Sequence, residues 1–170
     1  MNIKFLITLS LLTIVCSCKQ VQEEEIPQEA NTSEGITQKE IAKFKIIEFT
    51  LDPKTDKIIK NWQAYYQISD VVENVKKGDL SFFNDNKDGI QTLLEELETS
   101  IPAQVDNNAT QARLLTLKTK LYKLESLANI STTSKKELSK AIKEFLESFS
   151  NLNFQMNKKI EKDNQNIVKP

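Results

Sequence analysis

Oxygen-bearing side chains recur at short, regular intervals between residues 84 and 95, where the sequence runs NDNKDGIQTLLE. Counted from the first of these residues, positions one, three, five, nine and twelve are Asn84, Asn86, Asp88, Thr92 and Glu95. Calcium takes about six to eight oxygen ligands, and a glycine at position six, here Gly89, permits the sharp turn that such a loop makes around the ion. The chemistry that this spacing could perform is therefore calcium binding.

The segment resembles the twelve-residue calcium loop of EF-hand proteins but departs from it at two positions. Asn84 stands where that family commonly has Asp, and Gln91 stands where an aliphatic residue normally packs. Apolar residues also keep a helical spacing through the segment, at Leu80, Phe83, Ile90 and Leu94. That spacing predicts one continuous helix, which cannot fold around an ion. We therefore predict no metal site, and calcium binding at residues 84–95 is kept as an alternative.

An aromatic cluster, Trp62, Tyr65 and Tyr66, is the second candidate for a site. Aromatic rings of this kind can form a ligand- or partner-binding surface, but at helical spacing they also suit the half-buried face of a helix. Three acids close to one another, Glu95, Glu96 and Glu98, have no matching pair on another segment and are interpreted as a solvated helix face.

Composition excludes several classes of function. The 170-residue chain contains no histidine, so the commonest general base and metal ligand is missing. Its only cysteines are Cys16 and Cys18, at the N-terminus. A formal net charge of −1 and a single arginine, Arg113, argue against nucleic-acid binding. We predict no catalytic residues, no cofactor and no enzyme activity.

The N-terminus has the pattern of a secretory signal: a lysine at position 4, an apolar run from Phe5 to Val15, and the small Ser17 before Cys18. The apolar run is shorter than the roughly 20 residues that span a bilayer. Residues 15–18 resemble the lipobox of bacterial lipoproteins. The resemblance implies that residues 1–17 are a signal peptide and that Cys18 carries acyl chains such as palmitate, which attach the protein to the membrane.

Lys19 follows the cysteine where the inner-membrane retention signal of this family commonly has Asp. The resemblance therefore implies the outer membrane. The acidic run at residues 23–25 is similar to signals that send some lipoproteins to the cell surface, although a short acidic run is also ordinary solvation. The periplasmic face and the cell surface both stay open.

Residues 18–40 are polar and lack an apolar period, which predicts a flexible linker. Apolar residues then alternate between Ile41 and Leu51, which predicts a short extended arm that packs against helices without forming a sheet. The predicted helical domain covers residues 41–170.

Only 3 glycines and 4 prolines interrupt the chain, so we expect long helices. The first runs from Asp52-Pro53 to Gly78, the second from Leu80 to Pro102, the third from Asn107 or Asn108, and the fourth from Thr132 or Thr133. Each carries apolar residues at three- and four-residue spacing. The predicted fold is all-α, an up-down four-helix bundle.

Charge is unevenly distributed among these helices. Residues 79–106 hold seven acids and one lysine, whereas residues 107–130 hold four cations and one acid. Alternation of acidic and basic helices favours antiparallel pairing, with each exposed pair contributing only about 0.2–1 kcal/mol. The alternative is that a basic face, with Lys135, Lys136 and Lys140, meets an anionic partner.

Together these features predict a lipid-anchored cell-envelope protein whose helical domain works by non-catalytic binding or scaffolding. Its expected partners are the membrane, through Cys18, and a further envelope protein. The alternative function is small-ligand or calcium binding.

Overall fold

Six α-helices and one 3₁₀-helix make up the regular structure of residues 35–165, the part of the chain that this computed structural model describes. They are α2 (Gln38–Ile41), α3 (Pro53–Ile59), α4 (Gln63–Lys76), η1 (Ser81–Phe83), α5 (Lys87–Thr99), α6 (Asn108–Ala128) and α7 (Lys135–Asp163). No strand occurs in that range, and the predicted all-α class is confirmed for it. The predicted signal peptide and Cys18 lie outside the described residues.

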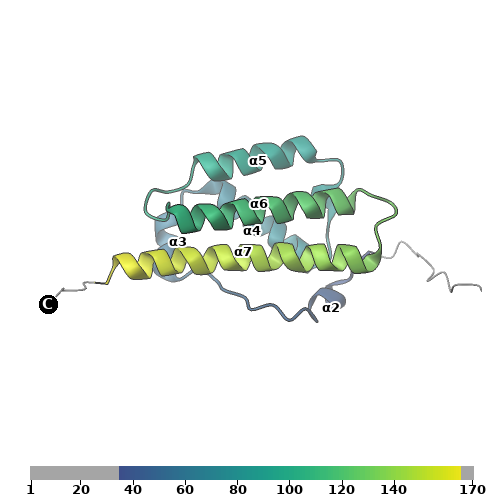
Figure 1. The fold of residues 1–170 in the computed structure, drawn as a ribbon, viewed down its shortest axis with the longest axis horizontal. Helices are drawn as coiled ribbons and strands as arrows, with labels where there is room; N and C mark the ends of the chain where they lie inside the picture. The colour runs from purple at the N-terminus through teal and green to yellow at the C-terminus, as the bar shows by residue number, and fades with distance from the viewer. Residues whose placement is uncertain (1–34, 166–170) are drawn as a thin grey trace, which may run out of the picture. The chain divides into compact units, whose positions relative to one another are not determined.

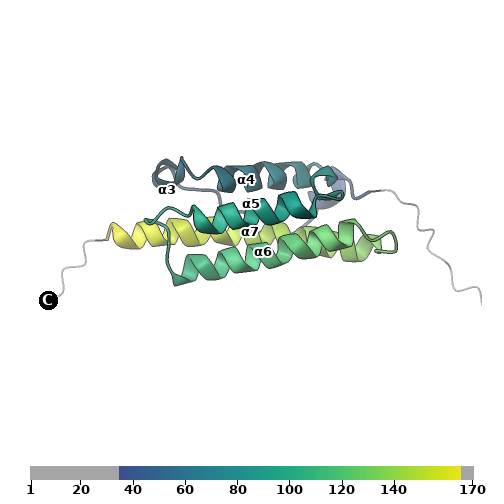
Figure 2. The ribbon, with the colours of Figure 1, turned by 90° about the horizontal axis from the view of Figure 1, so that it is seen from above.

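The four longest helices, α4 to α7, lie side by side along a common direction in both ribbon views (Figures 1 and 2). α6 packs along α7, α4 packs against α5 and α7, and α5 packs against α6. Each helix directs an apolar face inward, and the largest fully buried side chains include Trp62, Phe83 and Phe145. Burial of these apolar faces is the main force that holds the helices together.

The predicted first helix is two helices, because the chain turns at residues 60–62. The backbone N–H of Trp62 donates to the carbonyl of Ile59 (2.7 Å), and α4 begins one residue later. This turn places the Trp62 ring in the core, 1% exposed, where its indole N–H donates to the carbonyl of Leu97 (3.2 Å). The prediction of one uninterrupted helix from Asp52-Pro53 to Gly78 was therefore wrong. The helix breaks at residues 60–62, where the Trp62 side chain is buried.

The predicted second helix is also interrupted, at residues 84–86. Asp85 has a φ of +48°, a left-handed conformation that ends helical geometry. The side chain of Asn129 binds both sides of the turn: its amide group donates to the carbonyl of Phe83 (2.7 Å), and its oxygen accepts from the N–H of Asp85 (3.2 Å). The apolar spacing concealed this break because Phe83 and Ile90 are both buried on either side of it.

The third and fourth helices follow their predicted apolar stripes. Asn107 caps α6, with its side-chain oxygen accepting from the N–H groups of Ala109 and Thr110. α7 begins slightly later than predicted, since its cap is Ser134 and not Thr132 or Thr133. Ser134 and Glu137 bond reciprocally as a capping box, which satisfies backbone donors that the first turn leaves free.

Some charges pair across helices, as the alternation of acidic and basic segments suggested. Lys118 on α6 pairs with Glu98 on α5 at 3.1 Å. Lys120 and Lys123 on α6 share Glu144 on α7, at 3.0 and 2.9 Å. The acidic α5 thus forms an ion pair with the basic α6, and α6 also forms ion pairs with an acid of α7.

Ordered structure begins before the predicted linker boundary at residue 40. Ile36 is buried and α2 occupies Gln38–Ile41, so the end of the predicted linker belongs to the folded part. Gly78, at φ +86°, ends α4 and lies directly against this segment. A β-carbon there would come within 2.6 Å of the Ile36 carbonyl oxygen, so only glycine fits this close approach. Residues 45–52, which we call the arm, then run extended to α3.

Candidate functional site

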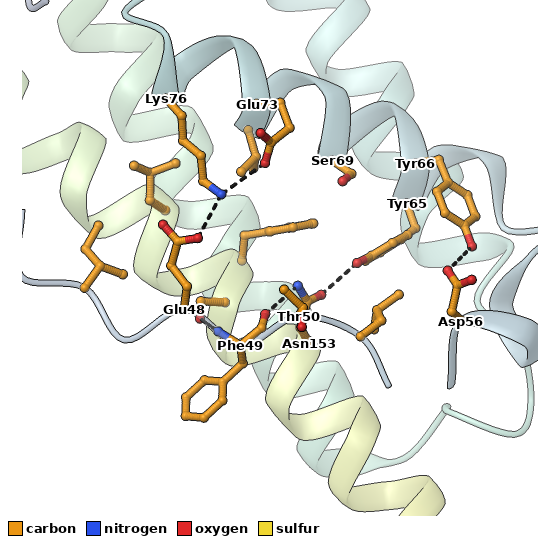
Figure 3. Close-up of a pocket in the computed structure, with 16 residues that line it drawn as sticks. Glu48, Phe49, Thr50, Asp56, Tyr65, Tyr66, Ser69, Glu73, Lys76 and Asn153 are labelled. Carbon is orange, nitrogen blue, oxygen red and sulfur yellow. Dashed lines mark hydrogen bonds and ion pairs between the residues drawn. The ribbon is translucent and has the colours of Figure 1, made fainter. Parts of the chain in front are cut away.

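The arm, α4 and α7 line a half-open pocket with a volume of about 240 Å³ (Figure 3). The arm forms one side of it, and α4 forms the opposite side with Tyr65, Ser69, Glu73 and Lys76. Asn153 of α7 lies between them. Elements far apart in the sequence therefore build this site together.

Polar side chains of α7 hold the first half of the arm through its backbone. The Ser150 hydroxyl accepts from the N–H of Phe49 (2.7 Å) and donates to the carbonyl of Ile47 (2.8 Å). One turn further along α7, the Asn153 amide donates to the carbonyl of Phe49 (3.0 Å). These bonds replace those that a neighbouring strand would make, which explains how an extended segment is stable beside helices.

Asn157 holds the second half of the arm in the same way. Its amide donates to the carbonyl of Thr50 (2.8 Å), and its oxygen accepts from the N–H of Asp52 (3.0 Å). Residues 150, 153 and 157 are spaced by three and four, so they lie on one face of α7. We call Ser150, Asn153 and Asn157 the polar ladder.

The aromatic cluster divides between the core and the pocket. Tyr65 lies between Trp62 and Phe149, with ring centroids 5.5 Å away on each side. Its hydroxyl donates to the oxygen of Asn153 (2.8 Å), the same residue that holds the arm. Burial raises the pKa of Tyr65 well above its usual value. Tyr65 and Tyr66 line the pocket, whereas Trp62 is a core residue.

Charged groups occupy both ends of the pocket (Figure 3). At one end, Lys76 pairs with Glu48 of the arm and Glu73 of α4, each at 3.0 Å. Burial lowers the pKa of Lys76, but hydrogen bonds to the two carboxylates outweigh it, and the pKa is raised overall. At the other end, the Tyr66 hydroxyl donates to Asp56 (2.9 Å). Burial, and then this bond, raises the pKa of Tyr66.

The predicted calcium-loop residues do not form a loop. Asn84 lies in the turn before α5 and Asn86 is its N-cap, whereas Asp88, Thr92 and Glu95 lie on the helix. Their side chains make local contacts: Thr92 donates to the carbonyl of Asp88 (3.0 Å), and Glu95 accepts from Gln91 (2.9 Å). Between residues 35 and 165, no three His, Cys, Asp or Glu side chains lie close enough to hold a metal.

The three lysines of the predicted basic face have different surroundings. Lys135 pairs with Glu40 of α2 at 2.9 Å, and Lys140 lies 4.0 Å from Glu144. Lys136 is exposed. Two of the three therefore have intramolecular partners, which reduces the positive charge that this surface offers to a partner.

A second pocket, of about 450 Å³, lies between the start of α3 and the end of α7. Its walls are mostly apolar and include Ile160. The hydroxyl of Thr55, which is fully buried beside it, makes no hydrogen bond to any group of residues 35–165. This pocket adjoins the last turn of α7.

Sequence reasoning found Tyr65 and Tyr66 but missed the polar ladder and the charged ends of the pocket. The ladder had a signal: three polar residues at helical spacing beside the apolar stripe of α7. The charged ends had none, because Glu48 and Lys76 are brought together only when the arm packs against α4.

None of the helices within residues 35–165 is both long and apolar enough to cross a membrane. The chain matches no protein-family model, no curated protein and no solved structure.

Proposed function

We propose that this chain is a lipid-anchored protein of the bacterial cell envelope that works by non-catalytic binding of another envelope component. In this proposal acylated Cys18 anchors the protein in the outer membrane, and α4 to α7 form an up-down four-helix bundle that carries the binding surface. The lipobox-like residues 15–18 support the anchor, and the mutual contacts of the four helices support the bundle.

The observation that carries the binding function is the exposure of apolar side chains on the arm and on α7. Ile47 is 77% exposed and Phe154 of α7 is 37% exposed. The Phe49 ring points away from the pocket (Figure 3) and lies 4.5 Å from the ring of Phe154. Lys158 lies over Phe154, 5.8 Å from its centroid. Exposed apolar side chains, among them a pair of rings in contact, favour contact with another molecule.

Crosslinking in intact cells tests the binding function. The chain is purified after crosslinking, and mass spectrometry compares the wild type with Ile47→Asp and with Leu115→Asp. Leu115 is a matched control, since it is 62% exposed but lies on α6. We expect one dominant envelope partner that Ile47→Asp loses and Leu115→Asp retains. A partner retained equally by both variants would exclude the arm as the contact.

The anchor is tested by the substitution Cys18→Ala. Without acyl chains the protein should move from the membrane fraction to the soluble fraction, because several buried acyl chains are what makes such anchoring stable. Continued presence in the membrane fraction would contradict lipid anchoring at this residue.

The pocket favours a second candidate function, the binding of a small ligand. Its volume of about 240 Å³ lies just below the usual range for small-molecule sites, about 300–1,000 Å³. Calcium receives less support than an organic ligand, because Asp88 and Glu95 are about two helical turns apart on α5.

A further inference from the structure

The charged side chains of the pocket favour ligands of one sign of charge. Three carboxylates, those of Glu48, Asp56 and Glu73, line it together with one ammonium group, that of Lys76. The formal net charge of these groups is −2, of which −1 belongs to the end with Glu48, Glu73 and Lys76, and a negative charge disfavours an anionic ligand and favours a cationic one. The side chains of Glu48 and Glu73 are each 57% exposed, so water screens their attraction for a cation, and packing of the ligand's apolar part must supply the rest of the affinity.

Two carboxylates have capacity for a further donor. Lys76 bonds to Oε2 of Glu48 and to Oε1 of Glu73. Each of these carboxylates therefore keeps its second oxygen as an acceptor, and the structure records no other hydrogen bond to either of them within residues 35–165. A primary ammonium group has three donors, so it could bond to both carboxylates at once. These two acids come from the arm and from α4, on opposite sides of the pocket.

The rest of the pocket wall is lined by residues that could pack against the apolar part of a ligand. Val72, Leu146 and Phe149 line the pocket, and Tyr65 stacks on Phe149 with ring centroids 5.5 Å apart. A volume of about 240 Å³ equals roughly eight water molecules in the liquid, which limits the part of a ligand inside the pocket to about ten non-hydrogen atoms. An aromatic or short aliphatic group fits this size and this surface.

From this arrangement we infer that the pocket binds a small organic cation: a protonated primary amine on a short aromatic or aliphatic body. Its ammonium group bonds to Glu48 and Glu73, and its body packs between α4, α7 and the arm. This inference rests on the second candidate function, small-ligand binding, and does not require the envelope partner.

Three probes of similar size and different charge test the ligand class on the full chain by calorimetric titration. They are phenethylamine, which is cationic, 2-phenylethanol, which is neutral, and phenylacetate, which is anionic. We expect phenethylamine to bind at least about tenfold more tightly than either of the other two.

Two double variants locate the site. Glu48→Gln with Glu73→Gln removes both charges but keeps the shape of the side chains. The matched control, Glu95→Gln with Glu96→Gln, removes two charges from the exposed face of α5. The affinity for phenethylamine should fall about tenfold or more in the first variant and stay unchanged in the second. Circular dichroism verifies that both variants are folded.

Three other outcomes would each contradict a specific part of this inference. If 2-phenylethanol binds as tightly as phenethylamine, the cationic class is wrong and small-ligand binding stands. If the control variant weakens binding as much as the pocket variant, the pocket is the wrong site. If no probe binds at about 10 mM, both the class and the second candidate function fail.

Discussion

The arm and the four long helices are stabilised by different interactions. The helices bury apolar side chains such as Leu117 and Phe145, both 0% exposed. The arm leaves Ile47 77% exposed, and its backbone is bonded to the polar ladder of α7. Apolar burial is non-directional, whereas hydrogen bonds require a particular partner at a particular distance.

The two kinds of interaction therefore have different roles: apolar burial supplies most of the stability, and the hydrogen bonds determine the position of the arm. Each hydrogen bond of the arm contributes about 0.5–1.5 kcal/mol net, less than the burial of one large apolar side chain. The ladder nevertheless determines where Glu48 and Phe49 lie, and so the shape of the pocket. We therefore expect core substitutions to lower the stability of the whole domain and ladder substitutions to release the arm while the helices persist.

The largest effect is expected in the core. Phe145→Ala removes a fully buried ring that contacts Phe83, with centroids 6.2 Å apart. The free energy of unfolding should fall by about 3–5 kcal/mol, because a cavity remains. Chemical denaturation measures the change, and Leu115→Ala, at a site that is 62% exposed, is the control. Equal losses in both variants would contradict the assignment of Phe145 to the core.

A smaller effect is expected at the ladder. Asn153→Ala removes the donor to the Phe49 carbonyl and leaves the buried Tyr65 hydroxyl without its acceptor. The free energy of unfolding should fall by about 1–3 kcal/mol. Hydrogen exchange should accelerate more in the arm than in α5 and α6, which respond only to the lower stability of the whole domain.

Asn151→Ala, at an exposed position of the same helix, is the control for the ladder. Unchanged exchange at the backbone N–H of Phe49 in Asn153→Ala would show that the arm does not depend on this residue.

The smallest effect is expected at the contact between α2 and the start of α7. Hydrogen bonds from the Thr37 backbone and from Lys135 lower the pKa of Glu40 from 4.5 to about 2. Because the pKa is lower in the folded state, this stabilisation is present above about pH 4.5 and is lost as the pH falls toward 2. The difference in denaturation midpoint between wild type and Glu40→Gln should therefore shrink over that interval. A difference that stays constant would mean that the Glu40 charge does not stabilise the fold.

Sequence patterns predicted α6 and α7 well because both helices satisfy local rules. Asn107 caps α6, and the predicted residues from Leu114 to Leu124 on α6 and from Ile142 to Met156 on α7 are buried. The same rules failed at residues 60–62 and 84–86. In both places an apolar spacing continues across a break, because Trp62 and Phe83 are buried through tertiary contacts and not through helical phase.

The candidate site was predicted only in part for a similar reason. Tyr65 and Tyr66 were visible as an aromatic cluster within one helix. Glu48 and Lys76 are 28 residues apart, and Phe49 and Ser150 are 101 residues apart. No local pattern links such residues, since their contact depends on the path of the arm across α4 and α7.

By itself, the sequence determined the all-α class, the absence of histidine chemistry and the positions of the long apolar stripes. These properties depend on composition and on helical periodicity, which are local. Only the tertiary structure decided where the helices break, which polar residues of α7 hold the arm, and which charges meet at the pocket. These features depend on contacts between distant residues, where a buried polar group must find a partner and the folded chain determines which one.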